Sequence, residues 1–203
     1  MFIEQPARWL RWLSPTATWR MSHKEKAVYI TFDDGPIPEA TPFILDTLDE
    51  YGIKATFFVV GDNVKKHPKL LQKILEKGHQ VGNHTFNHWS GYRHKLKAYK
   101  ENILKADELI HSRLFRPPYG WMTIEQRIWV AAHFNIIMWD LVTRDYSKRV
   151  TAQDVFDNVK KYARNGSIIT FHDSLRSIDK LRKVLPQCLQ WLKSQNYEFR
   201  TFD

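Results

Sequence analysis

The sequence predicts an α/β fold in which seven parallel strands alternate with helices and curl into a distorted, TIM-like (β/α)7 barrel. Short apolar runs rich in β-branched residues alternate with longer segments whose apolar residues have helical spacing. Such alternation is typical of parallel sheets with crossover helices. Polar clusters also follow the apolar runs repeatedly. Because seven strands are one fewer than a regular eight-stranded barrel has, we expect an irregular or incompletely closed barrel.

The predicted strands are short apolar segments that end at glycine, proline or polar residues. They are residues 27–32, 54–60, 79–81, 114–115, 135–139, 167–171 and 198–202.

The predicted helices lie between these strands and carry an apolar residue every three or four positions. Pro68 near the start of one and Gly78 just past its end are typical helix boundaries. Thr151 is a suitable N-cap for another. The helices are residues 42–50, 67–77, 95–111, 123–133, 151–163 and 179–194.

The chain divides into a barrel domain, residues 27–203, and an aromatic-rich N-terminal extension, residues 1–26. We expect the extension to pack on the barrel and cover part of its core. Tryptophans lie beside arginines in residues 8–19, so a short helix at a membrane interface, with peripheral membrane contact, stays open as an alternative. Arg8, Arg11 and Pro15 interrupt the apolar residues, so no secretory signal is recognised. This predicts a cytoplasmic location, with cell-envelope association left open.

The composition limits the possible partners. The formal net charge is +9, but the basic residues are scattered and match no nucleic-acid-binding motif. We therefore expect no nucleic acid partner. A soluble, cation-rich surface and attraction to an anionic polymer or membrane both remain open. Cys188 is the only cysteine, so no intramolecular disulfide can form, and we expect a monomer.

Ionisable side chains follow five of the predicted strands. Because the carboxyl ends of parallel strands meet at one end of a barrel, we expect these groups to lie together. They are Asp33 and Asp34 after the first strand, His84 and His88 after the third, Arg116 after the fourth, Asp140 and Asp145 after the fifth, and His172 and Asp173 after the sixth.

His84, His88 and one of the two carboxylates Asp33 and Asp34 have the composition of a metal site. The adjacent carboxylates of Asp33 and Asp34 repel each other unless something neutralises them, and a divalent cation would do so. Two histidines four apart in a helical turn project to the same side, which is metal-ligand spacing. Zn²⁺ suits two histidines and a carboxylate, although iron sites use similar ligands. A plain loop carboxylate that caps the next helix is the alternative for the Asp pair.

Four segments resemble the signatures of a known family in order and spacing. They are Thr31-Phe32-Asp33-Asp34-Gly35, His84-Thr85-Phe86-Asn87-His88, Arg116-Pro117-Pro118-Tyr119-Gly120 and the strand that ends at His172. The family is that of the polysaccharide deacetylases, carbohydrate esterase family 4, also called the NodB homology domain. The resemblance extends over residues 27–203 and implies the NodB homology fold, a distorted (β/α) barrel.

The resemblance also implies the ligands of a divalent metal ion, Zn²⁺ first and Co²⁺, Mn²⁺ or Ni²⁺ as alternatives. They would be Asp34, His84 and His88. Asp33 would be the general base that activates the attacking water, and Arg116 would orient it. A cation beside Asp33 would help to keep this base ionised.

The remaining implied roles concern the oxyanion and the leaving amine. The backbone N–H of Tyr119 would help to stabilise the oxyanion. His172 would be the general acid that protonates the leaving amine, and Asp145 would tune His172. These assignments complete a catalytic set for hydrolysis of an acetamide.

The sequence departs from the family pattern in two motifs. The fourth motif commonly reads Asp-x-x-Asp-Trp, but here Val142 replaces its first Asp and Tyr146 its Trp. We expect that Asp140 could substitute for the lost carboxylate. In the fifth motif, Thr170 stands where a Leu commonly helps to wall the acetyl pocket. These changes leave the implied ligands, base and acid in place and concern the substrate and its acyl group.

The leading functional prediction is a metal-dependent hydrolase that removes N-acetyl groups from N-acetylglucosamine-type residues of a polysaccharide or other glycan. One alternative is a related amide hydrolase on the same fold, a deformylase or a purine-catabolic amidohydrolase. Another is a glycan-binding module without activity. Release of acetate separates the first prediction from both alternatives.

Overall fold

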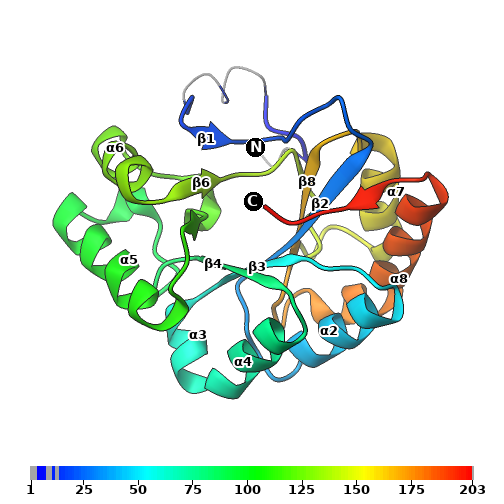
Figure 1. The fold of residues 1–203 in the computed structure, drawn as a ribbon, viewed down its shortest axis with the longest axis horizontal. Helices are drawn as coiled ribbons and strands as arrows, with labels where there is room; N and C mark the ends of the chain where they lie inside the picture. The colour runs from blue at the N-terminus through cyan, green and yellow to red at the C-terminus, as the bar shows by residue number, and fades with distance from the viewer. Residues whose placement is uncertain (1–3, 8–10, 12–13, 203) are drawn as a thin grey trace.

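The computed structural model describes residues 4–7, 11 and 14–202. These residues form a single curled sheet surrounded by helices (Figure 1). Every ladder between its named strands is parallel. The predicted α/β class and distorted barrel are therefore confirmed.

The sheet of the described residues has nine strands in the order β1-β6-β5-β4-β3-β2-β8-β7, and β9 also pairs with β2. The strands are β1 (Ala17–Thr18), β2 (Ala27–Asp33), β3 (Thr56–Val59), β4 (Gln80–Asn83), β5 (Leu114–Phe115), β6 (Asn135–Ile137), β7 (Leu141–Val142), β8 (Ser167–His172) and β9 (Glu198–Phe199).

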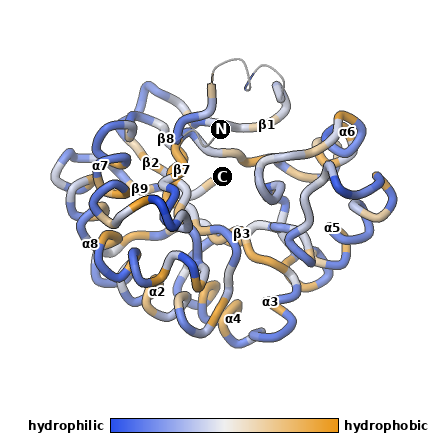
Figure 2. Tube along the Cα trace, turned by 180° about the vertical axis from the view of Figure 1, so that it is seen from behind, coloured by the Kyte–Doolittle hydropathy of each residue, from blue (hydrophilic) through white to orange (hydrophobic). Residues whose placement is uncertain are grey.

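The helices form the outer ring in Figure 1, and Figure 2 shows them alternating between hydrophilic and hydrophobic stretches, as expected for helices packed on a sheet. They are α2 (Thr41–Glu50), α3 (Gly61–Lys66), α4 (Pro68–Glu76), α5 (Leu96–Ile110), α6 (Ile124–His133), α7 (Ala152–Tyr162) and α8 (Ile178–Ser194), with short 3₁₀ turns η1 (Gly91–Arg93) and η2 (Pro118–Gly120). The sequence pattern did not predict α3, which is only six residues long.

The segment predicted as a strand at 135–139 forms β6 only over residues 135–137, and the short strand β7 that follows at 141–142 was not predicted. β6 pairs with β5, whereas β7 pairs with β8 on the other side of the barrel. Residues 138–140 connect the two, with the Met138 N–H bonded to the Thr18 carbonyl and the Asp140 N–H to the Ile168 carbonyl. Four Cα steps reach roughly 15 Å at most, so this segment brings the two edges of the sheet near each other. The barrel is closed here by the chain itself rather than by a complete strand pair.

The described part of the N-terminal extension contacts the barrel. β1 pairs with β6, the Glu4 carbonyl accepts a hydrogen bond from the Val142 N–H at 2.9 Å, and Trp19 packs edge-on against Trp139. Of the interfacial helix suggested for residues 8–19, residues 8–10, 12 and 13 lie outside the described residues. Among the helices that the structure describes, none has the length and apolar character needed to cross a bilayer.

The alternating direction of the side chains along β2 determines which of them face the candidate site. Val28, Ile30 and Phe32 pack against the helices, in the same cluster as the apolar faces of α2 and α8. Successive side chains of a strand point to opposite faces. The intervening residues, including Thr31 and Asp33, therefore face the interior of the barrel.

Candidate active site

Asp33 and His172 are cross-strand neighbours at the carboxyl ends of β2 and β8. The register pairs Asp33 with His172 and Thr31 with Thr170, so all four side chains lie on the inner face of the sheet. Thr31, Asp33 and Thr170 are buried and His172 is partly exposed. The sheet thus brings the predicted base and the predicted acid side by side.

Arg116 is completely buried and fixes the Asp33 carboxylate. Its Nη1 donates to Asp33 Oδ1 at 2.6 Å and to Thr31 Oγ1 at 2.8 Å. Its Nε and Nη2 donate to the carbonyls of Ile137 and Met138 at 3.1 and 2.9 Å. A buried guanidinium held at three nitrogens has little freedom, so it holds the Asp33 carboxylate in one orientation.

Asp34, His84 and His88 come together. Each offers one ligand atom, and these atoms lie within 4.8 Å of one another. His88 Nε2 is 3.1 Å and His84 Nε2 is 3.7 Å from Asp34 Oδ1. His84 Nδ1 lies 2.7 Å from the Arg116 carbonyl. Only a protonated Nδ1 can bond to a carbonyl, so the neutral ring presents the Nε2 lone pair towards Asp34, as in many metal sites.

The charges at this cluster fit a divalent cation. Burial lowers the pKa of His84 to about 4, so the ring is neutral at physiological pH and can act as a ligand. Burial alone would raise the pKa of Asp34, but the hydrogen bond from His88 and the charge of nearby His172 outweigh it and hold the pKa well below its usual range. One carboxylate and two imidazoles are a donor set that Zn²⁺ accepts.

The prediction that His84 and His88 share a helical turn is wrong. Residues 84–89 form a loop in which Thr85 and His88 have positive φ angles of 62° and 55°. The Thr85 N–H bonds to Asn83 Oδ1, and Asn102 Oδ1 on α5 accepts from the next two backbone N–H groups. The Asn83 and Asn102 side chains thus accept from backbone N–H groups that would bond to carbonyls in a helix. The loop nevertheless brings the centroids of the His84 and His88 rings to within 5.1 Å of each other.

His172 and Asp145 form a hydrogen-bonded dyad on the other side of Asp33. Asp145 Oδ1 lies 2.8 Å from His172 Nδ1, and Oδ2 accepts from the His172 backbone N–H at 2.8 Å. Burial of the ring lowers the pKa of His172, but the charge and hydrogen bond of Asp145 more than offset this, and the pKa is raised to about 9. The ring is therefore cationic at neutral pH with Nε2 protonated. Tyr146 packs edge-on against it at 4.5 Å.

Tyr119 lies beside the His pair on the turn after β5. Its φ is 61°, a conformation uncommon for a residue with a side chain, and its ring packs edge-on against His88 at 4.8 Å. The turn thus places Tyr119 beside His88 of the Asp34, His84 and His88 cluster, where the resemblance implied a role for its backbone N–H.

Asp140 does not belong to this site, and the expectation that it replaces the lost motif carboxylate is wrong. It is completely buried and accepts hydrogen bonds from Arg11, Arg164 and Ser167. Ser167 is the first residue of β8, whereas His172 is the last. Asp140 therefore lies towards the opposite end of the barrel. The break between β6 and β7, which the sequence pattern did not reveal, explains the error.

Sequence reasoning noted Thr170 only in connection with the acetyl pocket, and it missed the supporting hydrogen bonds of Thr31, Thr170 and Asn102. Thr31 Oγ1 and Thr170 Oγ1 lie 3.0 Å apart, so the two hydroxyls extend the polar network of Arg116. Asn102 holds the loop that carries His88. The only signal available was that Thr31 and Thr170 precede Asp33 and His172 by two residues, the period of one strand face.

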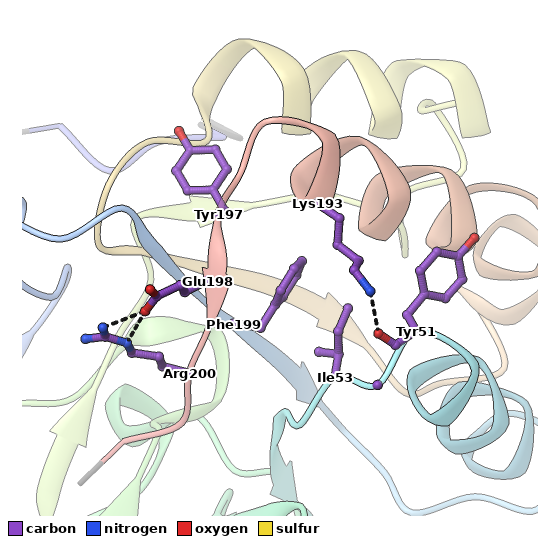
Figure 3. A pocket seen from close by; sticks show the side chains of 8 residues that line it. Tyr51, Ile53, Lys193, Tyr197, Glu198, Phe199 and Arg200 are labelled. Atoms are coloured by element: carbon purple, nitrogen blue, oxygen red, sulfur yellow. Dashed lines mark hydrogen bonds and ion pairs between the residues drawn. The ribbon is translucent and has the colours of Figure 1, made fainter.

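A second surface feature lies at the other end of the barrel. The pocket of Figure 3 is lined by the turn before β3 and by the segment around β9, including Tyr51, Lys193 and Phe199. Lys193 Nζ donates to the Tyr51 carbonyl at 2.9 Å. β9 pairs with the start of β2, so this pocket is remote from Asp33 at its end.

Comparisons with known proteins agree with the site. The family model for polysaccharide deacetylase matches residues 20–135. A peptidoglycan-N-acetylglucosamine deacetylase of Bacillus cereus is 33% identical, over 93% of both chains. Peptidoglycan-N-acetylglucosamine deacetylase PgdA of Listeria monocytogenes is 35% identical over 88% of this chain, which spans 38% of that protein.

Solved structures give the same result. The Bc1960 peptidoglycan N-acetylglucosamine deacetylase superposes with a TM-score of 0.84 at 32% identity, covering 95% of this chain and 94% of that one. A pseudoenzyme of the CE4 family from Bacillus anthracis is also similar, with a TM-score of 0.82 at 26% identity, covering 96% and 70%. Because one fold includes enzymes and a pseudoenzyme, the side chains of the site carry the functional argument. This chain belongs to the polysaccharide deacetylase family, carbohydrate esterase family 4, and is a hydrolase of carbon–nitrogen amide bonds.

Proposed function

We propose that the protein is a metal-dependent N-deacetylase that acts on N-acetylglucosamine residues of peptidoglycan or a related glycan. One observation carries the proposal: the cluster of Asp34, His84 and His88 lies beside a base held by Arg116 and an acid held by Asp145. The Bacillus cereus and Listeria monocytogenes relatives are peptidoglycan-N-acetylglucosamine deacetylases, and a chitooligosaccharide deacetylase of Sinorhizobium fredii is 36% identical over 72% of both chains.

In this proposal, Asp34, His84 and His88 hold the cation. A divalent ion supplies a Lewis acid for the acetyl carbonyl and a more acidic water, and Zn²⁺ suits these ligands best. His84 is fixed by its bond to the Arg116 carbonyl, so this residue would present Nε2 to the ion without turning its ring.

Asp33 takes the proton of the attacking water. Arg116 occupies its Oδ1, so Oδ2 is the oxygen that receives the proton. The guanidinium stabilises the charged carboxylate and prevents it from turning away. The Tyr119 backbone N–H donates to the oxyanion as the carbonyl carbon becomes tetrahedral.

His172 gives its proton to the leaving amine. The ring is cationic below about pH 9, and Asp145 holds Nδ1 so that Nε2 carries the transferable proton. An amine leaves poorly as an anion, so the C–N bond breaks as this proton arrives. The products are acetate and a glucosamine unit.

Acetate release tests the proposal. The purified chain is incubated with N-acetylglucosamine oligomers and with peptidoglycan, as isolated, after removal of metal by a chelator, and after addition of Zn²⁺, Co²⁺, Mn²⁺ or Ni²⁺. We expect release that is lost with the chelator and restored by a metal ion.

Asp33→Asn is the matched variant, because it keeps the ligands and removes only the base. We expect it to bind metal as the wild type does and to lose activity by at least about 10²-fold. Turnover that persists without metal, or an unaltered rate in Asp33→Asn, would refute the mechanism.

A further inference from the structure

The exposed large aromatic side chains of the described residues gather on two neighbouring loops. Tyr92, Tyr119 and Trp121 are 64%, 63% and 49% exposed. Tyr92 lies on η1, in the loop that carries the two histidine ligands, and the other two lie in and just after η2, in the loop that carries Arg116. These are the loops that follow β4 and β5 and that build the candidate site.

The backbones of these loops are tied together. The Gly91 N–H donates to the Trp121 carbonyl at 3.1 Å. The buried Gln126 side chain donates to the carbonyls of Gly91 and His94 at 3.0 and 2.8 Å. A Cβ on Gly91 would lie 2.8 Å from the Trp121 carbonyl oxygen, so the close approach requires glycine. The two rings are therefore presented by fixed backbone, which lowers the entropy lost when a ligand binds.

The rings form an angled surface. The ring centroids of Tyr92 and Trp121 are 5.7 Å apart with the planes tilted by 60°, so the rings do not cover each other's faces. Tyr119, two residues before Trp121, contacts His88 and joins this surface to the metal-ligand cluster. Aromatic area left exposed beside a site indicates a binding surface for part of the ligand.

We propose that Tyr92 and Trp121 form a platform for a pyranose ring of the glycan next to the residue that is deacetylated. This inference rests on the proposed function. A pyranose has an apolar C–H face that packs on the electron-rich face of an aromatic ring, while its hydroxyls stay in water. The phenol and indole N–H add hydrogen-bonding groups at the edges. A chain that reacts at the metal-ligand cluster extends past Tyr119 onto this platform.

An apolar partner is the competing occupant. Ile124 and Ile128 on α6 are also exposed, and a lipid surface or a second copy of the chain would use them with Trp121. A sugar stacks on aromatic faces and gains little from aliphatic side chains. Ile128→Ala is therefore the matched control, since it removes exposed apolar area without removing a ring.

The experiment compares acetate release from N-acetylglucosamine oligomers of two to six units by wild type, Tyr92→Ala, Trp121→Ala and Ile128→Ala. We expect each aromatic variant to raise KM for the hexamer about three- to tenfold, with kcat unchanged. We expect a smaller increase in KM for the dimer. KM for the hexamer should return towards the wild-type value in Trp121→Phe and stay unchanged in Ile128→Ala. The platform would be overturned if the aromatic variants raised KM equally for every oligomer length or left KM for the hexamer unchanged. It would also be overturned if Ile128→Ala raised KM for the hexamer as much as they do.

Binding without turnover separates the two proposals. The Asp33→Asn protein, with and without Trp121→Ala, is titrated with the hexamer by calorimetry. If the wild type releases no acetate but Trp121→Ala weakens hexamer binding, the proposed function fails and the platform stands. If acetate is released and Trp121→Ala binds the hexamer as tightly as its parent, the platform fails and the proposed function stands. Near-wild-type unfolding of Trp121→Ala confirms that the change is local.

Discussion

Each reactive side chain of the site is held by a partner that fixes its orientation. Arg116 serves two of them at once, because its guanidinium binds Asp33 and its carbonyl accepts from His84. Asp145 holds His172 in the same way, with both carboxylate oxygens engaged. The orientation of Asp33 and the cationic state of His172 therefore exist before substrate binds.

Asp145→Asn tests the control of the acid. In the proposed mechanism His172 acts when protonated, and the carboxylate of Asp145 raises its pKa to about 9. An amide removes the negative charge, so the pKa falls and the proton is lost at lower pH. We expect the basic limb of the kcat profile to move to lower pH, with a larger loss of activity at pH 8 than at pH 6. Metal content should stay unchanged, and a basic limb that does not move would contradict this assignment.

The hydroxyls of Thr31 and Thr170, which are linked to Arg116, lead to a prediction about the stability of the fold. Thr31→Val removes an acceptor from Arg116 Nη1 and leaves a buried donor unpaired. We expect a loss of about 1–3 kcal/mol in the free energy of unfolding by urea. Thr170→Val keeps that acceptor and should cost less, about 1 kcal/mol. A larger loss in Thr170→Val than in Thr31→Val would show that the pair does not act through Arg116.

For individual residues, the sequence could predict the side chains with distinctive chemistry, but it could not predict the side chains that hold them in position. Asp34, His84 and His88 are uncommon groups at strand ends, and the structure brings them together. Thr31 and Thr170 lie within strands, where threonine is frequent, so their types carried no signal. Their function depends on the register of β2 against β8, which only the folded sheet provides.

Among the elements, the turn after β2 is packed most tightly. A Cβ on Gly35 would lie 2.0 Å from Asp173 Oδ2, and the buried Asp173 carboxyl is itself held by Thr41 at 2.6 Å. The turn that carries Asp34 therefore has no room for a larger residue. Its position relative to His84 and His88 depends on this contact.

Gly35→Ala tests this packing. The new methyl must displace the turn or Asp173, and overpacking of this kind costs about 1–3 kcal/mol. Because Asp34 moves with the turn, we expect weaker Zn²⁺ binding in a competition titration. Gly52→Ala is the matched control: its φ of +65° makes alanine strained, but no atom lies within 4 Å of the added Cβ. Equal loss of Zn²⁺ affinity in both variants would show that general destabilisation, not the turn, is responsible.

Periodicity predicted most elements and failed where side chains override it. The long amphipathic segment at 95–111 corresponds to α5, because a wide apolar face determines a helix locally. The His84 loop and the division of 135–142 into β6 and β7 depend on distant partners, Asn102 and β8. No pattern within these short segments contains that information.

For the whole molecule, closure of the barrel depends on a buried carboxylate. Asp140 follows the break between β6 and β7 and binds Arg11 from the N-terminal extension, Arg164 from the loop before β8, and Ser167. One side chain thus joins three distant parts of the chain at the point where the sheet has no complete ladder. The described part of the N-terminal extension is held to the barrel through this contact and through Glu4.

Asp140→Asn should destabilise the fold without altering the chemistry. Burial alone would raise the pKa of Asp140, but its hydrogen bonds to Arg164, Arg11 and Ser167 outweigh burial and hold the pKa below its usual value. A carboxyl with a depressed folded pKa stabilises the protein above its unfolded pKa of about 3.9, and this stability is lost as the pH falls through the folded value.

We therefore expect Asp140→Asn to lower the free energy of unfolding by about 3 kcal/mol between pH 5 and 8, and the difference from wild type to narrow below about pH 4. Urea unfolding across this range measures it, and Asp46→Asn, at an exposed carboxylate, should change little. Metal affinity and kcat should remain near wild type, since Asp140 lies towards the end of the barrel opposite His172. If Asp140→Asn lowered kcat and left the free energy of unfolding unchanged, Asp140 would instead have a function in the active site.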